Sequence, residues 1–347
     1  MADPLLEVSD LKIYFFTDEG VVKAVDGVDL TIEHGKTLCL VGESGCGKSV
    51  TSRAFLQIIR KPGRIVSGEM LWHRRRDDNT EEIIDLAKLD PRGEFIRQIR
   101  GSEIAMIFQA PMTSLSLMHT IGDQITEMVQ LHTKATKQEA RERGIEMLQR
   151  VGIPRPERLI DEYPFRLSGG MRQRAMIAMA LSCNPKLLIA DEPTTALDVT
   201  TQAQILDLML ELQSDYGMAL LFITHDLGIV AEIADDVAVM YLGRIVERSD
   251  VYTVFNEPKH PYTQALLRSI PKIAMRRDDL EPIKGMVPSP FRRPAGCHFH
   301  PRCGQRFEPC NQIEPVNTHL DEKHEVRCLL YEDVSAPALD SKAVSHG

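Results

Sequence analysis

The N-terminal part of the chain alternates short apolar runs with turn residues. Residues 5–13, 28–32 and 37–41 read as β-strands, and the first leads into a cluster of three aromatic residues at 14–16. The run 37–41 is continuously apolar, as is typical of a strand buried on both faces. A glycine-rich segment follows it, and residues 50–59 then carry a helical pattern. The order predicted here is strand, glycine-rich loop, helix.

Strand patterns return in the second half of the chain. Apolar runs at 187–190, 219–224 and 237–241 predict buried strands, and residues 201–213 predict a helix between the first two. Strands that alternate with crossover helices form parallel sheets. The sequence therefore predicts an α/β fold with a parallel-sheet core, preceded by antiparallel β-structure.

Two other regions differ from this pattern in composition and in the spacing of their apolar residues. Charged helical patterns over 112–168 predict an inserted helical subdomain, and the chain beyond about residue 255 becomes irregular and rich in Pro, Arg and Cys. We expect one large domain over residues 1–255 and a small loop-rich appendage over 256–335. The small, polar residues 336–347 predict a disordered tail.

Composition narrows the possible partners. The net charge is −9, from 41 basic and 50 acidic residues, which argues against nucleic acid because phosphate binders carry basic excess. The basic cluster at 73–76 is followed at once by Asp77 and Asp78 and is interpreted as a solvated loop. No apolar stretch approaches the ~20 residues of a membrane helix, and the start carries no export signal. We expect a soluble, cytoplasmic protein.

Residues 42–49 read GESGCGKS and fit the phosphate-loop pattern G-x-x-x-x-G-K-[ST]. Glycines let backbone N–H groups surround a phosphate, and the helix N-terminus adds a favourable dipole. Lys48 is expected to reach the β- and γ-phosphates, and Ser49 to ligate Mg²⁺. The predicted ATP contacts in this segment are Gly42, Ser44, Gly45, Cys46, Gly47, Lys48, Ser49 and Val50.

Two acidic residues close the apolar run 187–190. Asp191 and Glu192 stand at the C-terminal end of a predicted parallel strand, where α/β sheets bind ligands. Asp191 is expected to hold Mg²⁺ and Glu192 to orient and activate the attacking water. Together with the phosphate loop, they predict a nucleotide-hydrolysing protein.

The segment 167–174, LSGGMRQR, lies one short helix ahead of this acidic pair and resembles the signature motif of ATP-binding cassette (ABC) proteins. A serine hydroxyl and two glycine N–H groups at a helix start form an anion site. The resemblance implies that Ser168, Gly169, Gly170 and Gln173 contact ATP held by a second cassette. It therefore implies a head-to-tail dimer.

Further residues match family positions. Gln109 resembles the glutamine that touches Mg²⁺ and water, Asp198 the aspartate of the loop that crosses the dimer interface, and His225 the switch histidine at the γ-phosphate. Phe15 resembles the aromatic residue that stacks on adenine. Tyr14 is the alternative for that role, and core packing stays open as an explanation of both residues.

Details beyond the motifs resemble the ATPases of oligopeptide and dipeptide importers. These are residues 110–115 (APMTSL), residues 259–267 (KHPYTQALL) and the cysteine-rich tail. The resemblance implies an ATPase motor on the cytoplasmic face of the membrane, peripheral to two transmembrane permease subunits and served indirectly by an extracytoplasmic binding protein. It implies a second, paralogous ATP-binding subunit, although a homodimer stays open. Nickel or oligosaccharide cargo, or a soluble ABC ATPase with a non-membrane partner, are the alternatives.

Four of the seven cysteines fall within the appendage, at positions 297, 303, 310 and 328. Zinc sites favour tight C-x₂₋₄-C pairs, which are absent from this tail, whereas a [4Fe–4S] cluster accepts wider spacings. The importer resemblance implies a cluster held by Cys297, Cys303, Cys310 and Cys328. Zinc, with His298, His300 or His324 as further ligands, and an unmetallated tail stay open as alternatives.

Overall fold

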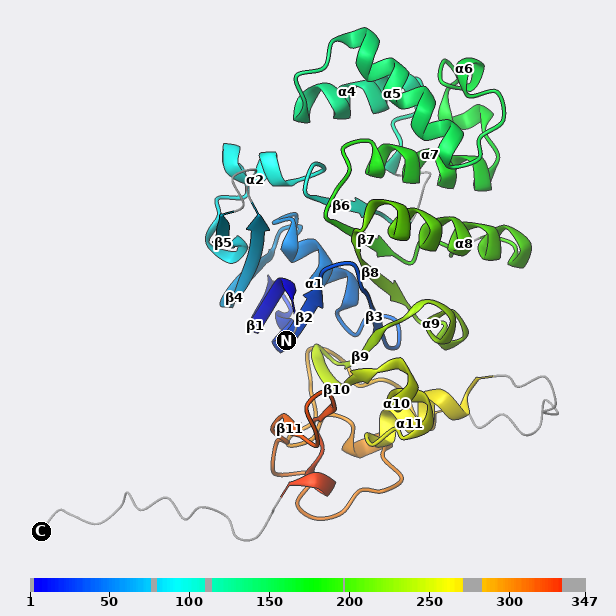
Figure 1. The fold of residues 1–347 in the computed structure, drawn as a ribbon. Helices are drawn as coiled ribbons and strands as arrows, with labels where there is room; N and C mark the ends of the chain where they lie inside the picture. The colour runs from blue at the N-terminus through cyan, green and yellow to red at the C-terminus, as the bar shows by residue number, and fades with distance from the viewer. Residues whose placement is uncertain (1–2, 76–79, 110–113, 196, 271–282, 333–347) are drawn as a thin grey trace, which may run out of the picture.

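Two sheets with helices around them form the fold, as Figure 1 shows. The computed structural model describes residues 3–75, 80–109, 114–195, 197–270 and 283–332. The inserted helices lie at one end of the molecule and the C-terminal residues at the other, with the sheets between them.

The smaller sheet is antiparallel and has the strand order β2-β1-β4-β5. Its strands are β1 Pro4–Thr17, β2 Gly20–Glu33, β4 Gly63–Arg75 and β5 Glu81–Asp85. The predicted antiparallel β-structure is therefore present. Both hairpin strands are longer than predicted, so that the aromatic cluster at 14–16 belongs to β1.

The larger sheet has the order β11-β12-β10-β9-β3-β8-β7-β6. Its strands are β3 Thr37–Val41, β6 Ile104–Ile107, β7 Leu187–Asp191, β8 Ala219–Thr224, β9 Asp236–Tyr241, β10 Arg244–Asp250, β11 Thr318–His319 and β12 Glu325–Val326. The five strands from β9 to β6 are parallel. Four of them were predicted, whereas β6 was not. At the other edge of this sheet, the short strands β11 and β12 are added next to β10 in antiparallel pairing. The sequence did not predict these two strands.

The helices are α1 Lys48–Phe55, α2 Glu94–Ile99, α4 Ile121–His132, α5 Lys137–Arg150, α6 Pro156–Leu159, α7 Gly169–Leu181, α8 Val199–Tyr216, α9 Leu227–Ile233, α10 Val251–Asn256 and α11 Pro261–Arg268. Short 3₁₀ turns are η1 Leu86–Lys88, η2 Pro164–Arg166, η4 His300–Arg302 and η5 Leu329–Tyr331. Helices α4 and α5 each begin with a capping box, at Thr120 and Thr136. They form the predicted helical insertion.

The central strands feed two hydrophobic cores because successive side chains of a strand point to opposite faces. In β3, Leu38 and Leu40 pack into the core between the two sheets. Cys39 and Val41 pack into the other core, with α7, α8 and the inserted helices. This double burial explains why β3 reads as a continuous apolar run.

Two local predictions were wrong. The helix after the phosphate loop ends at Phe55 rather than at 59, and Gln57 takes a left-handed conformation (φ 51°) just beyond it. Residues 73–75 of the basic cluster belong to β4 and not to a loop. Arg74 pairs there with Glu82 and Glu103, and Arg75 with Asp3, so acidic partners offset the charge of both arginines. Residues 76–78 lie outside the described residues, as does the tail 336–347.

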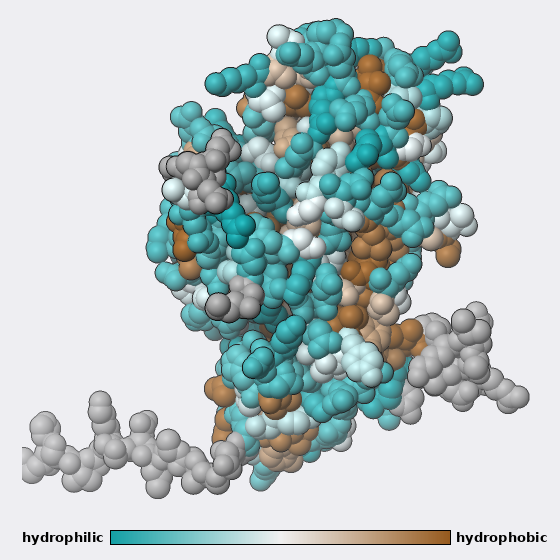
Figure 2. Space-filling model, in the orientation of Figure 1, coloured by the Kyte–Doolittle hydropathy of each residue, from teal (hydrophilic) through white to brown (hydrophobic). Residues whose placement is uncertain are grey.

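The surface is mostly hydrophilic on the face drawn in Figure 2, with hydrophobic residues in separate groups. Across the part of the chain that the structure describes, no helix combines the length and the apolar character needed to cross a membrane.

Candidate active site

The phosphate loop lies between β3 and α1, at the carboxyl end of the central parallel strand. Gly47 caps α1 with φ 114°, and Gly42 opens the loop with φ 153°. A Cβ atom at Gly42 would lie 2.2 Å from the carbonyl oxygen of Met240, and one at Gly47 2.4 Å from that of Ala24. Both positions therefore require glycine, for backbone conformation and for space.

Within this loop, Ser44 and Gly45 are exposed to solvent, whereas Lys48 is buried. The Nζ atom of Lys48 donates to the carbonyl oxygens of Gly42 at 2.7 Å and of Glu43 at 3.2 Å. The lysine thus curls back against its own loop. The lysine ammonium group is a hydrogen-bond donor, so phosphate oxygens would compete with these two carbonyl oxygens for it.

Ser49, in the first turn of α1, contacts Asp191 at the end of β7. The Ser49 hydroxyl donates to Oδ1 of Asp191 at 2.7 Å, and a guanidinium nitrogen of Arg53 lies 3.8 Å from Oδ2. Burial raises the pKa of the Asp191 carboxyl, and Oδ2 has no hydrogen-bond partner among the described residues. A buried carboxylate oxygen without a donor beside a serine hydroxyl fits the hard oxygen ligands that Mg²⁺ prefers.

Glu192 lies between the two other residues predicted to be catalytic, Gln109 and His225. Its carboxylate accepts a hydrogen bond from Gln109 Nε2 at 2.9 Å and from the Thr195 hydroxyl at 3.1 Å, and it lies 3.4 Å from His225 Nδ1. Its own φ is 48°, a left-handed conformation that is uncommon for a non-glycine residue. Such backbone conformations gather at functional sites, where surrounding contacts maintain them.

The structure thus brings Glu192, Gln109 and His225 together, as the sequence predicted. Thr195 was missed, although it is only three residues beyond Glu192. Residues 110–113, which carry most of the predicted importer segment after Gln109, lie outside the described residues.

Ser168 begins α7 as its N-cap residue, and its hydroxyl accepts the Met171 N–H. Gly169 and Gly170 form the first turn, where helix N–H groups are free to bind an anion. The structure does not agree with the prediction that Gln173 contacts ATP. The Gln173 side chain is fully buried, on the same face of α7 as the buried residue Ile177. Both of its polar atoms lack a hydrogen-bond partner among the described residues.

Asp198 caps the N-terminus of α8, and both its carboxylate oxygens bond to Thr201, at 3.0 and 2.7 Å. Its neighbour Ala196 lies outside the described residues. Of the two adenine candidates, Phe15 is half-buried against Gly63, and Tyr14 donates its hydroxyl to Asp26 at 2.5 Å. Phe15 therefore packs partly into the core.

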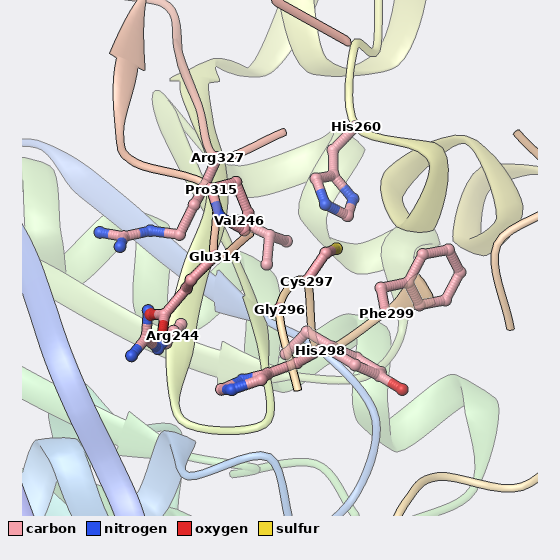
Figure 3. Close-up of a pocket in the computed structure, with 11 residues that line it drawn as sticks. Arg244, Val246, His260, Gly296, Cys297, His298, Phe299, Glu314, Pro315 and Arg327 are labelled. Atoms are coloured by element: carbon pink, nitrogen blue, oxygen red, sulfur yellow. The ribbon is translucent and has the colours of Figure 1, made fainter. Parts of the chain in front are cut away.

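The four C-terminal cysteines line one small cavity together with His260 and Leu329. Burial raises the pKa of Cys297 to about 11 and that of Cys328 to about 12. Figure 3 shows a second pocket that shares His260, Cys297 and Phe299 with this cavity, and in it the Cys297 sulfur is turned towards the His260 ring. All four cysteines are free thiols.

These cysteines do not form a site for one metal ion. In the described ranges, no three His, Cys, Asp or Glu side chains are arranged to hold such an ion. A tetrahedral zinc ion needs its sulfur ligands within roughly 4 Å of one another, because each Zn–S bond is about 2.3 Å. The arrangement therefore does not support zinc, and the iron–sulfur prediction has only the shared cavity in its favour.

Two contacts to the phosphate loop were also missed. The Tyr262 hydroxyl accepts the Glu43 N–H at 3.0 Å, and Arg302 pairs with the Glu43 carboxylate. Both residues come from the region after residue 255. The segment HPYT at 260–263 was visible in the sequence, but nothing there indicated what it contacts.

Comparison with known proteins agrees with this geometry. The family model described as "ABC transporter" matches residues 25–195, and that described as "Oligopeptide/dipeptide transporter, C-terminal region" matches residues 246–310. A putative peptide import ATP-binding protein of Brucella ovis is 49% identical over 96% of this chain and 99% of its own length. The oligopeptide transport ATP-binding protein AppD of Bacillus subtilis is 50% identical over 96% of this chain and 98% of its own length.

Among solved structures, a dimeric post-hydrolysis state of the ATP-binding cassette MJ0796, bound to ADP and phosphate, matches with a TM-score of 0.60. It is 24% identical and covers 71% of this chain and 98% of its own, so this likeness shows the cassette fold. With about half of its residues identical to those of such relatives over almost the whole length, the chain belongs to the family of ABC transporter ATP-binding proteins.

Proposed function

We propose that this chain is the ATP-hydrolysing motor subunit of a membrane importer for dipeptides or oligopeptides. The observation that carries the proposal is the Glu192 carboxylate, which Gln109 and Thr195 hold at the end of β7, one residue from Asp191. A carboxylate so oriented, beside a phosphate loop, is placed to activate water. The names of the relatives supply the cargo class.

Hydrolysis follows from these positions. Lys48 turns from the Gly42 and Glu43 carbonyls to the β- and γ-phosphates. When bound at Ser49 and Asp191, Mg²⁺ offsets phosphate charge. Glu192 accepts a proton from water as the water oxygen bonds to the γ-phosphorus, and the bond to the bridging oxygen breaks to release ADP. His225, 3.4 Å from Glu192, is placed to contact the γ-phosphate and the same carboxylate.

The site is completed by a second cassette. Ser168, Gly169 and Gly170 at the start of α7 would cap ATP held by the partner's phosphate loop, with Asp198 at the interface. The related cassette MJ0796 is described as dimeric, which supports this arrangement. We propose a heterodimer with a paralogous ATP-binding subunit. Dimerisation of this chain alone with ATP, measured by size-exclusion chromatography, would instead favour a homodimer.

We propose that the ATPase pair docks on two permease subunits, at the cytoplasmic face of the membrane, with the extracytoplasmic binding protein acting indirectly. Co-purification of the tagged chain with integral membrane proteins tests this. Recovery of only non-membrane partners would favour a soluble ABC ATPase. Import of labelled dipeptides, nickel or oligosaccharides by the reconstituted complex then decides among cargoes.

We propose that Cys297, Cys303, Cys310 and Cys328 hold a [4Fe–4S] cluster in a C-terminal domain, residues 256–335, that follows the cassette, residues 1–255, and packs against it. The shared cavity supports this, because a cluster separates its four thiolates more widely than one ion does. Anaerobic purification followed by iron, sulfide and zinc assays tests the proposal. We expect about four irons and four sulfides per chain; one zinc per chain, or neither metal, would contradict it.

The ATPase assignment is tested by phosphate release from the purified complex. We expect Mg²⁺-dependent hydrolysis that Lys48→Ala abolishes by weakening nucleotide binding, because Lys48 is the buried cation of the loop. The matched control is Lys134→Ala, an exposed lysine of the helical insertion. Equal nucleotide affinity in Lys48→Ala and wild type would contradict the assignment.

A further inference from the structure

Glu43, the second residue of the phosphate loop, is held on three sides. Its N–H donates to the Tyr262 hydroxyl at 3.0 Å. Its carboxylate accepts two hydrogen bonds from the Arg302 guanidinium, at 2.6 and 3.0 Å. Its carbonyl oxygen accepts from Lys48 Nζ at 3.2 Å. Tyr262 and Arg302 are 219 and 259 residues away along the chain, beyond the motifs of the cassette.

The two distant residues are themselves fixed by packing. The Tyr262 side chain is fully buried, with its ring centroid 4.7 Å from that of Tyr241 and 5.3 Å from that of Phe299. The N–H of Tyr262 donates to His260 Nδ1 at 3.0 Å, and Pro261 occupies the first turn of α11. The HPYT segment therefore aims the tyrosine hydroxyl at the loop.

Arg302 is equally constrained. Its side chain is only 4% exposed, and its Nε donates to the Lys284 carbonyl at 3.2 Å. The hydrogen bonds to Glu43 outweigh burial and raise the pKa of the guanidinium. A two-pronged contact between guanidinium and carboxylate fixes geometry as well as charge, and shielding from water strengthens it relative to a surface ion pair.

These contacts act on the part of the loop that Lys48 touches. The lysine bonds to the carbonyls of Gly42 and Glu43, and must exchange both for phosphate oxygens when nucleotide binds. Tyr262 and Arg302 hold the N–H and the carboxylate of Glu43, which Lys48 does not contact, so that the loop keeps its shape after the lysine leaves. A loop already in its binding shape loses less conformational entropy on binding.

We propose that Tyr262 and Arg302 are positioning residues for the nucleotide site, through which the C-terminal region sets the affinity of the phosphate loop for ATP. The inference rests on the ATP-binding function proposed above and adds residues outside the cassette motifs to it. Neither residue is expected to touch the nucleotide. Each acts through Glu43.

The test measures binding of Mg²⁺ with the non-hydrolysable analogue AMP-PNP by titration calorimetry. We expect Arg302→Met to raise the Kd roughly tenfold, which corresponds to about 1.4 kcal/mol. Tyr262→Phe should raise it by a few-fold, because it removes one neutral acceptor. Arg302→Lys keeps the charge without the two-pronged contact and should fall between wild type and Arg302→Met. In steady-state hydrolysis, KM for ATP should rise while kcat changes little.

The matched control is Arg306→Met, an exposed arginine of the same loop, which should leave Kd unchanged. A double-mutant cycle tests the route: after Glu43→Gln, adding Arg302→Met should raise Kd little further. If Arg302→Met, Arg302→Lys and Tyr262→Phe lower only the melting temperature and leave Kd at the wild-type value, the positioning role is wrong. A wild-type protein that binds no AMP-PNP would overturn the ATP-binding assignment itself, so the two failures are distinguishable.

Discussion

The carboxylate of Glu247 lies 2.8 Å from Nε2 of His324, 77 residues further along the chain. Their side chains are 0% and 2% exposed. The same carboxylate accepts the backbone N–H groups of Lys259 at 2.6 Å and His260 at 2.9 Å. One buried acid on β10 therefore ties the last part of the cassette to the start of α11 and to the turn before β12.

Replacing this acid should loosen the C-terminal region. Glu247→Gln keeps the shape but turns an amide NH₂ towards donors, so we expect the free energy of unfolding to fall by about 2–3 kcal/mol. Hydrogen exchange at the Lys259 and His260 amides should also accelerate. The control is Glu322→Gln, an exposed acid close to His324. Unchanged exchange at both amides would contradict the anchoring role.

Removing the proposed general base should separate binding from hydrolysis. Glu192→Gln keeps the hydrogen-bonding shape but cannot accept a proton, so we expect kcat to fall roughly 10²–10⁴-fold. AMP-PNP affinity should stay within a few-fold of wild type. Phosphate release and calorimetry measure the two effects, with exposed Glu232→Gln as control. Sustained hydrolysis by Glu192→Gln would rule out this carboxylate as the base.

Two glycines of the phosphate loop should differ in their tolerance of alanine. Gly45 and Gly47 both have positive φ, 80° and 114°. A Cβ at Gly47 would lie 2.4 Å from the Ala24 carbonyl oxygen, whereas one at Gly45 would meet nothing within 4 Å. We expect Gly45→Ala to cost about 1 kcal/mol of stability and Gly47→Ala several times more. Equal melting temperatures for the two variants would contradict the tight packing at Gly47.

Tyr14 should make stability sensitive to alkaline pH. Burial, together with the hydrogen bond to Asp26, raises its pKa from 10.0 to about 12. Between these values the unfolded chain releases the proton while the folded protein keeps it, so stability falls as pH rises through this window. We expect the melting temperature of Tyr14→Phe to decline less between about pH 10 and 12 than that of wild type. An identical decline would show that the Tyr14 hydroxyl is not held by Asp26.

The sequence predicted the central sheet and much of the nucleotide site because their signals are local. Continuous apolar runs marked β3, β7 and β8, which are buried on both faces. The residues of the phosphate loop and the pair Asp191–Glu192 follow those strands directly, and parallel strands bring their carboxyl ends together. Gln109 and His225 were assigned from the family resemblance, and the structure places both beside Glu192.

Gln173 shows the limit of a motif without its surroundings. Its position in the signature segment suggested contact with ATP, but the helical period of α7 turns it to the buried row. A linear motif does not say which face of a helix the rest of the fold will cover.

By itself, therefore, the sequence determined the nucleotide-binding loop, the acidic pair and the strands that carry them, since each depends on residues a few positions apart. Only the tertiary structure decided what Tyr262, Arg302 and Glu247 do. Tyr262 and Arg302 both contact Glu43, from 219 and 259 residues away along the chain. Glu247 contacts His324, which is 77 residues away. Hydrogen bonds and ion pairs have a range of a few ångströms, so such contacts exist only once the sheet and the C-terminal region have packed.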